Sequence, residues 1–404
     1  MRADVPKIRA AVPKYVGASF DDCPPGHRFG LYFLIWNDKW EIEGKRKSEA
    51  LKQTLSLPPH AQETLKSLRG RQSILLDAIP EVARLSIEAK STAPFATGLG
   101  MEHPLENGFA FLNPYGLAYL PGSSIKGVLR RAAEELAGEL IEVDRMGWMQ
   151  STITALFGLE SKDRQKEHTR GALTFWDALP NPAKNSMGME VMTPHYADYY
   201  KGETTPHDAG QPNPIVFLVV PADSEFSFHV TCDTTRLSEE LSSTWQDLMR
   251  VAFEHAFDWL GFGAKTAVGY GAMRRDEEAE AKAERARAEK EAEARRQREE
   301  ADRAARRAGL SENERRIEDF IEVAQKRYDQ LRGRREKRNT GVHSLAQQLA
   351  KDALGGGWSA DERRTLVEAI EVWLPKLVEH FDRKDDWREE RKKLKLRELK
   401  GDAS

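Results

Sequence analysis

The chain has 404 residues, of which 62 are Lys or Arg and 65 are Asp or Glu, so its formal net charge is −3. This balance excludes a generally basic nucleic-acid binder, because any bound polyanion must then meet positive charge that is local. The two cysteines, Cys23 and Cys232, exclude a disulfide framework and a C-x-x-C metal site.

We expect two or three domains from the length and a reducing, cytoplasmic location from the cysteine content. No hydrophobic run approaches the ~20 residues of a membrane span. The first residues, MRADVPKIRAAVPKY, lack the apolar core of a signal peptide. A membrane partner is therefore not expected.

The first third of the chain predicts an irregular arm, then mixed strands and helices. Residues 1–29 are rich in proline and charge, and the apolar run 30–37 has the length of a strand. Residues 61–79 have leucines at helical spacing, and 84–90 alternates as a strand does. The glycine-rich stretch 91–119 has no periodicity, and loops this long are usually functional or disordered.

The middle third predicts two helices and several strands. Ser123 follows Pro121–Gly122 as a natural N-cap, and the helix runs to about Leu136. Its apolar stripe is Ile125, Val128, Leu129, Ala132 and Leu136. Further expected elements are strands at 172–176 and 188–192, a hairpin of 215–220 with 225–231, a helix over 237–260 ending at Gly261, and a last strand at 268–273.

The composition changes sharply at Arg275. Residues 276–307 are almost wholly Glu, Ala, Arg and Lys, with opposite charges three or four apart, which predicts a solvated helix without the apolar stripe of a coiled coil. Amphipathic helices are predicted again after Gly309, and further helices begin near Val342 and Ser359. The tail over 382–400 is predicted to be another charged helix. We therefore predict four parts, which are 1–29, 30–274, 275–308 and 309–404.

Two segments suggest a surface that holds a polyanion. LGFGAKTAVGYGAM (260–273) places Gly261, Gly263, Gly269 and Gly271 around Lys265, and glycines let a backbone approach a ligand closely. YLPGSSIKGVLRR (119–131) is a turn feeding a basic helix, whose N-terminus adds N–H donors and a positive dipole end. The order of the elements favours RNA over a nucleotide.

Lys265, Ser124 and Lys126 are the predicted phosphate contacts. Arg130 and Arg131 are further candidates, and one of them is expected to be solvated or salt-bridged. The glycine loop is not a phosphate-binding P-loop, because no glycine directly precedes Lys265 and the loop follows a helix.

The segment TPHYADYYKGETTPHDAG (193–210) and His103 offer other chemistry. His195, Asp198, His207 and Asp208 suggest a metal site or an acid–base pair, but their spacing fits no standard zinc pattern, so neither a metal nor another cofactor is expected. Tyr196, Tyr199 and Tyr200 beside Lys201 suit stacking on bases or packing against a neighbouring subunit. His103 is a candidate general base, although a lone histidine in a loop is more often structural.

The glycine loop and the 119–131 turn resemble the RAMP superfamily, the RNA-binding subunits of CRISPR effector complexes. In that family an LPGSSIKG-like turn opens the first helix, and a glycine-rich loop lies near the end of the fold. ATGLGMEHPLENGF (96–109), VMTPHYADYYKG (191–202) and PNPIVFLVVP (212–221) narrow the resemblance to the family of sixth subunits of the type III-B (Cmr) complex. The resemblance covers roughly 30–274 and not the C-terminal third.

This resemblance implies an α+β, ferredoxin-like (RRM-like) RAMP domain with insertions, followed by a long charged helix and a small all-α module. It implies a non-catalytic RNA-binding subunit that caps the backbone filament near the 3′ end of the guide RNA. The implied partners are the guide RNA, the complementary target RNA, the repeated backbone subunit, the adjacent end-cap RAMP subunit and the helical small subunit. The RNA-binding residues would be Ser124, Lys126, Arg130, Arg131, His195, Tyr196, Lys201, Gly261, Gly263, Lys265, Gly269 and Gly271.

Two alternatives remain open at this point. One is a metal-independent endoribonuclease that processes the guide RNA, for which His103, His195 and Lys265 would supply the base, the acid and the cation. The other is a protein-interaction module that acts through its helical C-terminus.

Overall fold

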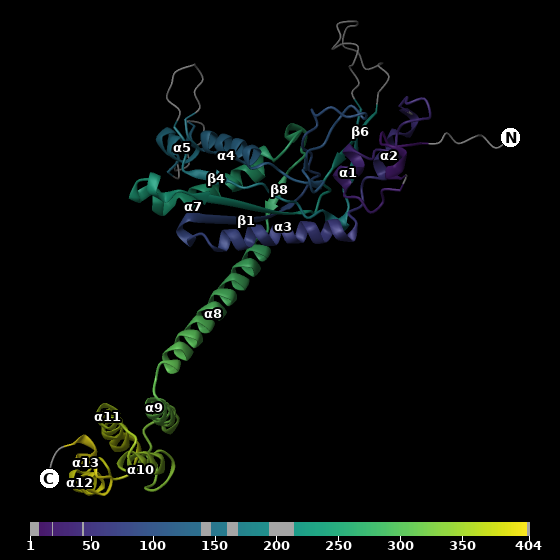
Figure 1. Ribbon diagram of the computed structural model, residues 1–404. Coiled ribbons are helices and arrows are strands. Elements are labelled where there is room, and N and C mark those ends of the chain that lie inside the picture. Colours follow the sequence, from purple (N-terminus) through teal and green to yellow (C-terminus); the bar gives the residue numbers. More distant parts are fainter. Residues whose placement is uncertain are drawn as a thin grey trace. The chain divides into compact units, whose positions relative to one another are not determined.

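The computed structural model describes residues 8–17, 19–42, 44–138, 147–159, 169–193 and 214–401. The chain divides into two compact units, Met1–Arg287 and Ala288–Ser404 (Figure 1). The first unit is a mixture of helices and strands, and the second is all-helical, as predicted. The elements before residue 276 are α1 (Pro25–Gly30), α2 (Lys47–Lys52), α3 (Pro59–Asp77), β1 (Arg84–Ser91), β2 (Phe111–Leu112), β3 (Leu117–Ala118), α4 (Gly122–Ala137), α5 (Gln150–Phe157), β4 (Leu173–Phe175), β5 (Gly188–Met192), β6 (Ile215–Val219), β7 (Glu225–Cys232), α7 (Glu239–His255) and β8 (Met273–Arg275).

Four strands of the described chain form an antiparallel sheet in the order β4-β7-β1-β8. The connections β1–α4–β4 and β7–α7–β8 place one helix after each central strand, so the two halves repeat a strand–helix–strand pattern. Alternate residues of β1, Leu85, Ile87 and Ala89, are buried in the main core. The stripe residues Ile125, Leu129 and Ala132 of α4 join the same core, so the predicted amphipathic face is confirmed.

The opposite face of this sheet is polar and is covered by α3 (Figure 1). Arg69 of α3 donates to the hydroxyl of Ser227 at 2.9 Å, and that hydroxyl donates to Glu88 at 2.6 Å. Burial raises the pKa of Glu88 and lowers the pKa of His229 on the same face to about 4. This face is therefore not the open RNA platform that an RRM sheet offers.

Several predicted elements are corrected by the structure. The run 30–37 is not a strand, because α1 extends to Gly30 and only Trp36 forms isolated bridges, to Arg9 and Ile42. For the same reason the end of the predicted irregular arm is helical. In the run 30–37 the apolar side chains Phe33 and Ile35 are buried without strand pairing, so hydrophobicity alone suggested a strand that does not form.

The predicted hairpin of 215–220 with 225–231 is also wrong, although both strands exist. β6 pairs with β5, whereas β7 pairs with β1 and β4. The turn residues between β6 and β7 therefore link two different sheets. The last strand begins at Met273 rather than 268, because Thr266–Val268 forms a 3-10 turn.

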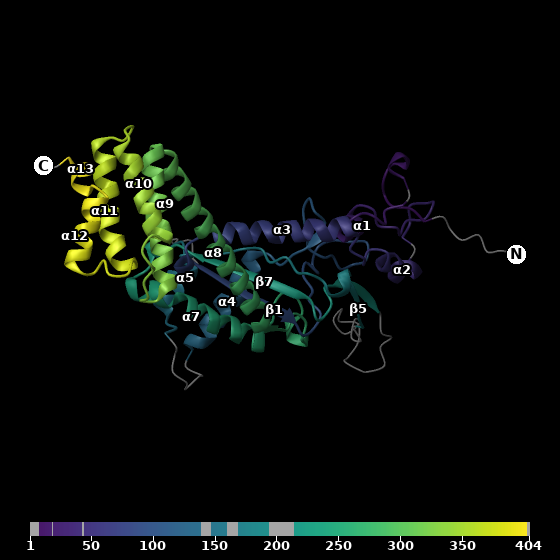
Figure 2. The ribbon, with the colours of Figure 1, turned by 90° about the horizontal axis from the view of Figure 1, so that it is seen from below.

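The second unit begins within α8 (Glu277–Ala308) and continues through α9 (Glu312–Leu331), α10 (Gly341–Leu354), α11 (Ala360–Leu377), α12 (Lys384–Lys393) and α13 (Leu396–Lys400). Figure 2 shows α9 to α13 gathered into one bundle. Ser311 and Ser359 each form a capping box at the start of α9 and α11. The predicted single helix over 382–400 is two helices, because Lys395 takes a left-handed conformation with φ of 51°. None of the described helices is long and apolar enough to cross a membrane.

The first three turns of α8 contact the first unit, although the helix has no buried residue. Glu280 accepts from the backbone N–H of Glu88 at 3.1 Å and pairs with Arg275 at 2.7 Å. Arg287 pairs with Asp77 of α3 at 3.2 Å. The division by contacts therefore falls at residue 287, thirteen residues after the predicted boundary at 274.

A fragment of residues 1–287 is expected to fold as stably as the first unit does in the full chain. A fragment of residues 1–275 should fold but lose about 1–3 kcal/mol, because the Glu88 N–H and the Arg275 guanidinium lose a charged partner. Thermal melts of both fragments, followed by circular dichroism, measure the difference. Equal melting temperatures would show that the start of α8 adds nothing, and aggregation of both would place the C-terminal unit in the main core.

Candidate nucleic-acid interface

The glycine loop is held in place by the segment that follows β1. The π-helical turn Ala256–Leu260 continues α7 and ends at Gly261, as the sequence predicts. Beyond it, the Ala264 N–H donates to the Ala96 carbonyl at 2.7 Å, and the Gly271 N–H donates to the Pro94 carbonyl at 2.8 Å. Both ends of the loop are therefore fixed to the same neighbouring segment.

All four glycines of the loop have positive φ, and two of them also lack space for a side chain. A Cβ on Gly271 would overlap the carbonyl of Phe262, and one on Gly263 would overlap the carbonyl of Ala96. Gly269 has a φ of 93° but faces open space. The glycines thus let the loop pack closely against the rest of the protein, whereas the sequence suggested only a close approach to a ligand.

Lys265 has a left-handed backbone, with φ of 62°, and occupies the start of the 3-10 turn. Its Nζ lies 2.8 Å from the sulfur of Met192 and 6.0 Å from the centre of the Phe217 ring. Within the described residues it has no carboxylate partner. A thioether is a weak acceptor and the ammonium has three donors, so Lys265 retains donors for an anionic ligand.

The loop lies beside the β5–β6 pair. Tyr270 and Ala264 pack on a small cluster that includes Phe217 and Met192. Met192 is the last residue of β5, so Lys265 lies next to the point where the chain enters 194–213. The predicted contacts His195, Tyr196 and Lys201 lie in that segment, outside the described residues, as do Asp198, His207 and Asp208 of the suggested metal site.

The start of α4 differs from the prediction in its capping. Gly122 is the first helical residue, and its N–H donates to the carboxylate of Asp177 at 2.7 Å, so Ser123 is not the N-cap. A carboxylate here offsets part of the positive end of the helix dipole. Ser124 is exposed and Lys126 half-buried, and neither side chain has a partner among the described residues. The π-helical turn contacts α4, so the glycine loop begins beside this helix.

Arg130 and Arg131 are both engaged in pairs on their own helix. Arg130 Nε lies 3.2 Å from Glu134, and Arg131 Nε lies 2.8 Å from Glu135. The hydrogen bond from His255 is the main cause that lowers the pKa of Glu135. The expectation that one arginine is salt-bridged therefore holds for two, which leaves Lys126 and Lys265 as the unpaired cations of the predicted set within the described chain.

His103 is bound on both ring nitrogens. Its Nε2 donates to the Phe29 carbonyl at 3.0 Å, its Nδ1 accepts from the Leu105 N–H at 3.1 Å, and its ring stacks on Phe29 at 3.7 Å. Burial lowers the pKa of this imidazole. A neutral ring with both nitrogens occupied cannot exchange a proton with a substrate unless this packing opens.

Two exposed apolar side chains, one directly before the loop and one within it, were not predicted from the sequence. Trp259 is 79% exposed and Val268 is 73% exposed. Trp259 lies in the π-helical turn, and π-helical turns often occur at functional sites. An aromatic residue directly before a glycine loop could have been recognised as a base-stacking candidate.

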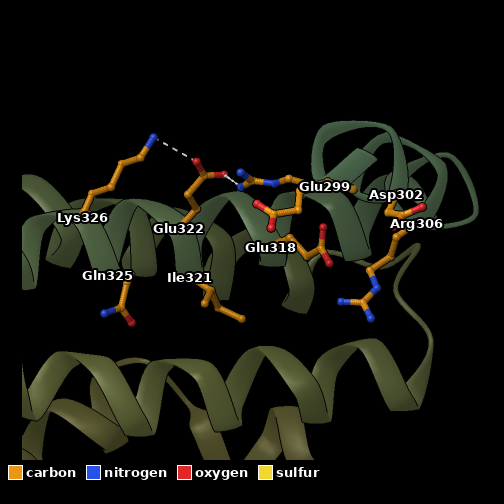
Figure 3. Close-up of a pocket in the computed structure, with 9 residues that line it drawn as sticks. Glu299, Asp302, Arg306, Glu318, Ile321, Glu322, Gln325 and Lys326 are labelled. Carbon is orange, nitrogen blue, oxygen red and sulfur yellow. Dashed lines mark hydrogen bonds and ion pairs between the residues drawn. The ribbon is translucent and has the colours of Figure 1, made fainter. Parts of the chain in front are cut away.

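A pocket lies elsewhere, between the end of α8 and α9 (Figure 3). Three of its charged side chains pair with one another, since Glu322 pairs with both Arg303 and Lys326. Ile321, which also lines the pocket, packs against the core of the C-terminal unit. Within the described ranges no three His, Cys, Asp or Glu side chains gather as metal ligands would.

The chain is similar in sequence to known proteins. Residues 88–274 match the model of the RAMP superfamily. CRISPR system Cmr subunit Cmr6 of Pyrococcus furiosus is 26% identical over 275 residues, which cover 56% of this chain and 77% of that protein. Three solved structures are also similar, with low TM-scores. A chain of the type III-B Cmr-beta complex bound to cognate target RNA is 20% identical with a TM-score of 0.40, and the match covers 60% of this chain and 78% of that one.

The crystal structure of Cmr6 from Pyrococcus furiosus is 23% identical with a TM-score of 0.27, over 48% of this chain and 98% of that one. A chain of a type IV-B CRISPR complex is 15% identical with a TM-score of 0.32, over 48% of this chain and 89% of that one. The family match spans the motifs around Lys126 and Lys265. Residues 88–274 are therefore those of a RAMP superfamily domain, and the chain resembles Cmr6.

Proposed function

We propose that this chain is a non-catalytic, RNA-binding subunit of a type III-B CRISPR effector complex in the cytoplasm. The observation that carries the proposal is the glycine loop, which holds Lys265 in a fixed backbone conformation without a carboxylate partner among the described residues. The match of 88–274 to the RAMP family supports it. So does the sheet order β4-β7-β1-β8 with its repeated strand–helix–strand connections, which is that of a ferredoxin-like (RRM-like) fold.

The RNA would be bound mainly by its backbone. In an RNA-guided complex base pairing reads the sequence, so the protein needs contacts that tolerate every base. Lys265 and Lys126 supply charge for phosphates, while Trp259 supplies a ring on which any base can stack. Because α3 covers the polar face of the sheet, the RNA would bind on the side that carries the glycine loop and the start of α4.

Within the complex the chain would cap the backbone filament near the 3′ end of the guide. Its partners would be the guide and target RNAs, the repeated backbone subunit, the adjacent end-cap RAMP subunit and the helical small subunit. Residues 91–119 would reach between nucleotides or towards a neighbouring subunit. Met101 in that segment is 54% exposed. Glu106 forms an ion pair with Lys47 at 2.7 Å, so part of the segment is anchored.

Co-purification tests the assignment. A tagged chain expressed with the other complex subunits and a guide should recover both the backbone subunit and the guide RNA. Fragment 1–287 should still recover them if the RAMP domain carries the assembly. Recovery that depends only on residues 288–404 would instead support the protein-interaction alternative.

The endoribonuclease alternative makes a different prediction. We expect no site-specific cleavage of a labelled repeat RNA, with or without Mg²⁺ or Mn²⁺, because His103 has no accessible nitrogen. His103→Ala should lower stability by about 1–3 kcal/mol, since it leaves the Leu105 N–H and the Phe29 carbonyl without partners. Cleavage that is present in the parent chain and disappears in His103→Ala or His195→Ala would establish the enzyme instead.

A further inference from the structure

A pocket of about 520 Å³ lies within the C-terminal unit, lined by α10, α12 and the loop before α10. Four cations line it, namely Arg338, Lys351, Lys393 and Lys395, and the only carboxylate among its lining residues is Glu390. A concave surface lined by one sign of charge concentrates ions of the opposite sign. The pocket is separate from the glycine loop, which belongs to the other unit.

The one carboxylate of the pocket is occupied by a buried histidine. His343 Nδ1 accepts from the Asn339 N–H at 2.8 Å, so Nε2 carries the ring proton and donates it to Glu390 at 3.0 Å. The two side chains are only 1% and 6% exposed. Glu390 keeps its charge, but its side chain is buried against His343 and forms no ion pair with the lysines of the pocket in the described chain.

The rim lysines are available to a ligand. Lys351 and Lys393 are exposed and have no ion-pair partner within the described chain. Arg338 and Lys395 pair with Asp386 at 2.7 Å and with Glu398 at 3.1 Å, so they contribute charge that is partly offset. Two residues of the pocket thus carry most of its unpaired positive charge.

The positive surface continues along the loop that leads into the pocket. Arg332, Arg334 and Lys337 are exposed in this loop and are without ion pairs in the part of the chain that the structure describes. A single phosphate would need only the pocket, whereas this extended arrangement suits a chain of phosphates. Besides these cations, the wall combines the amides of Asn339 and Gln347 with aliphatic side chains. Its one ring, that of His343, is only 1% exposed and so is not available for stacking, which favours contact with the backbone over recognition of bases.

We propose that this pocket and the adjoining loop bind the phosphate backbone of single-stranded RNA. The site goes beyond the proposed function, because it gives the C-terminal unit an RNA contact of its own. It also explains why a unit outside the RAMP match carries unpaired lysines around a buried, satisfied His–Glu pair.

Hydrogen exchange on the full-length chain tests the location. Adding a short single-stranded RNA should protect peptides from α10 and α12, and this protection should persist in the Lys265→Ala variant. Absence of protection there in the parent chain would overturn the proposal. Loss of this protection in Lys265→Ala would also overturn it, because the contact would then depend on the RAMP domain.

Paired variants test the chemistry. Lys351→Gln with Lys393→Gln should weaken RNA binding about tenfold and flatten the dependence of log Kobs on log[salt] by about 0.7 for each phosphate that the protein no longer neutralises. Lys326→Gln with Lys376→Gln removes the same charge from exposed positions outside the pocket and should have little effect. Equal losses of affinity in the two double variants would mean non-specific attraction and would refute a site.

Two competitors separate RNA from other anions. Adenosine monophosphate and polyglutamate, each at the phosphate-equivalent concentration of the RNA, should fail to protect α10 and α12. Equal protection by the mononucleotide would replace the proposal with a nucleotide site, and equal protection by polyglutamate would replace it with a docking site for an acidic protein.

Discussion

Replacing Lys265 and Lys126 together by alanine is expected to weaken guide-RNA binding in the assembled complex by about 1–3 kcal/mol. Neither lysine has a carboxylate partner in the described chain, so the substitutions remove charge that an RNA phosphate would otherwise meet. The loop is held by backbone hydrogen bonds to Pro94 and Ala96, so it should keep its shape without the lysine side chain. The weaker binding should therefore reflect the missing phosphate interactions and not unfolding.

Filter binding at two salt concentrations measures this effect, because the salt dependence becomes shallower with every phosphate that the protein no longer neutralises. Lys52→Ala with Lys66→Ala is a matched control, since both are exposed lysines on helices α2 and α3 of the same unit. An unchanged affinity and salt slope for the Lys265/Lys126 variant would mean that these residues do not bind phosphate. An equally large effect in the control would mean that only the net charge matters.

The sequence predicts the long periodic elements well. The helices over 61–79, 123–136 and 237–260 are confirmed within a few residues, because each has an apolar face that must be buried. Strand pairing is not local, so the turn after β6 suggested a hairpin, whereas β7 in fact pairs with β1 and β4. The apolar run 30–37 misled for a related reason, since its side chains enter the core from an irregular backbone.

The candidate site is predictable in type but not in its partners. The glycines and Lys265 are visible in the sequence, yet their contact with the segment after β1 joins residues far apart in the chain. The cap from Asp177 could not be foreseen either, because it comes from a residue after β4 that reaches α4 only in the folded chain. His103 looked available for catalysis only because its stacking on Phe29 is a tertiary contact.

Gly271→Ala is expected to destabilise the first unit by about 2–5 kcal/mol. Its φ of 71° costs an L-residue about 1–2 kcal/mol. The added methyl group would also overlap the Phe262 carbonyl, and forcing extra volume into a packed region costs about 1–3 kcal/mol more. Phe262 is fully buried beside Phe228 and Phe253, so the backbone cannot move aside without disturbing the core.

Gly269→Ala is the matched comparison, because its φ of 93° carries a similar backbone cost while its Cβ would meet nothing within 4 Å. It should therefore cost only about 1–2 kcal/mol. Hydrogen exchange of peptides from β1 and β7 measures the stability of the first unit separately from that of the C-terminal helices. Gly271→Ala should speed this exchange far more than Gly269→Ala. Similar rates for the two variants would mean that the loop relaxes freely. That result would contradict the fixed backbone conformation of Lys265.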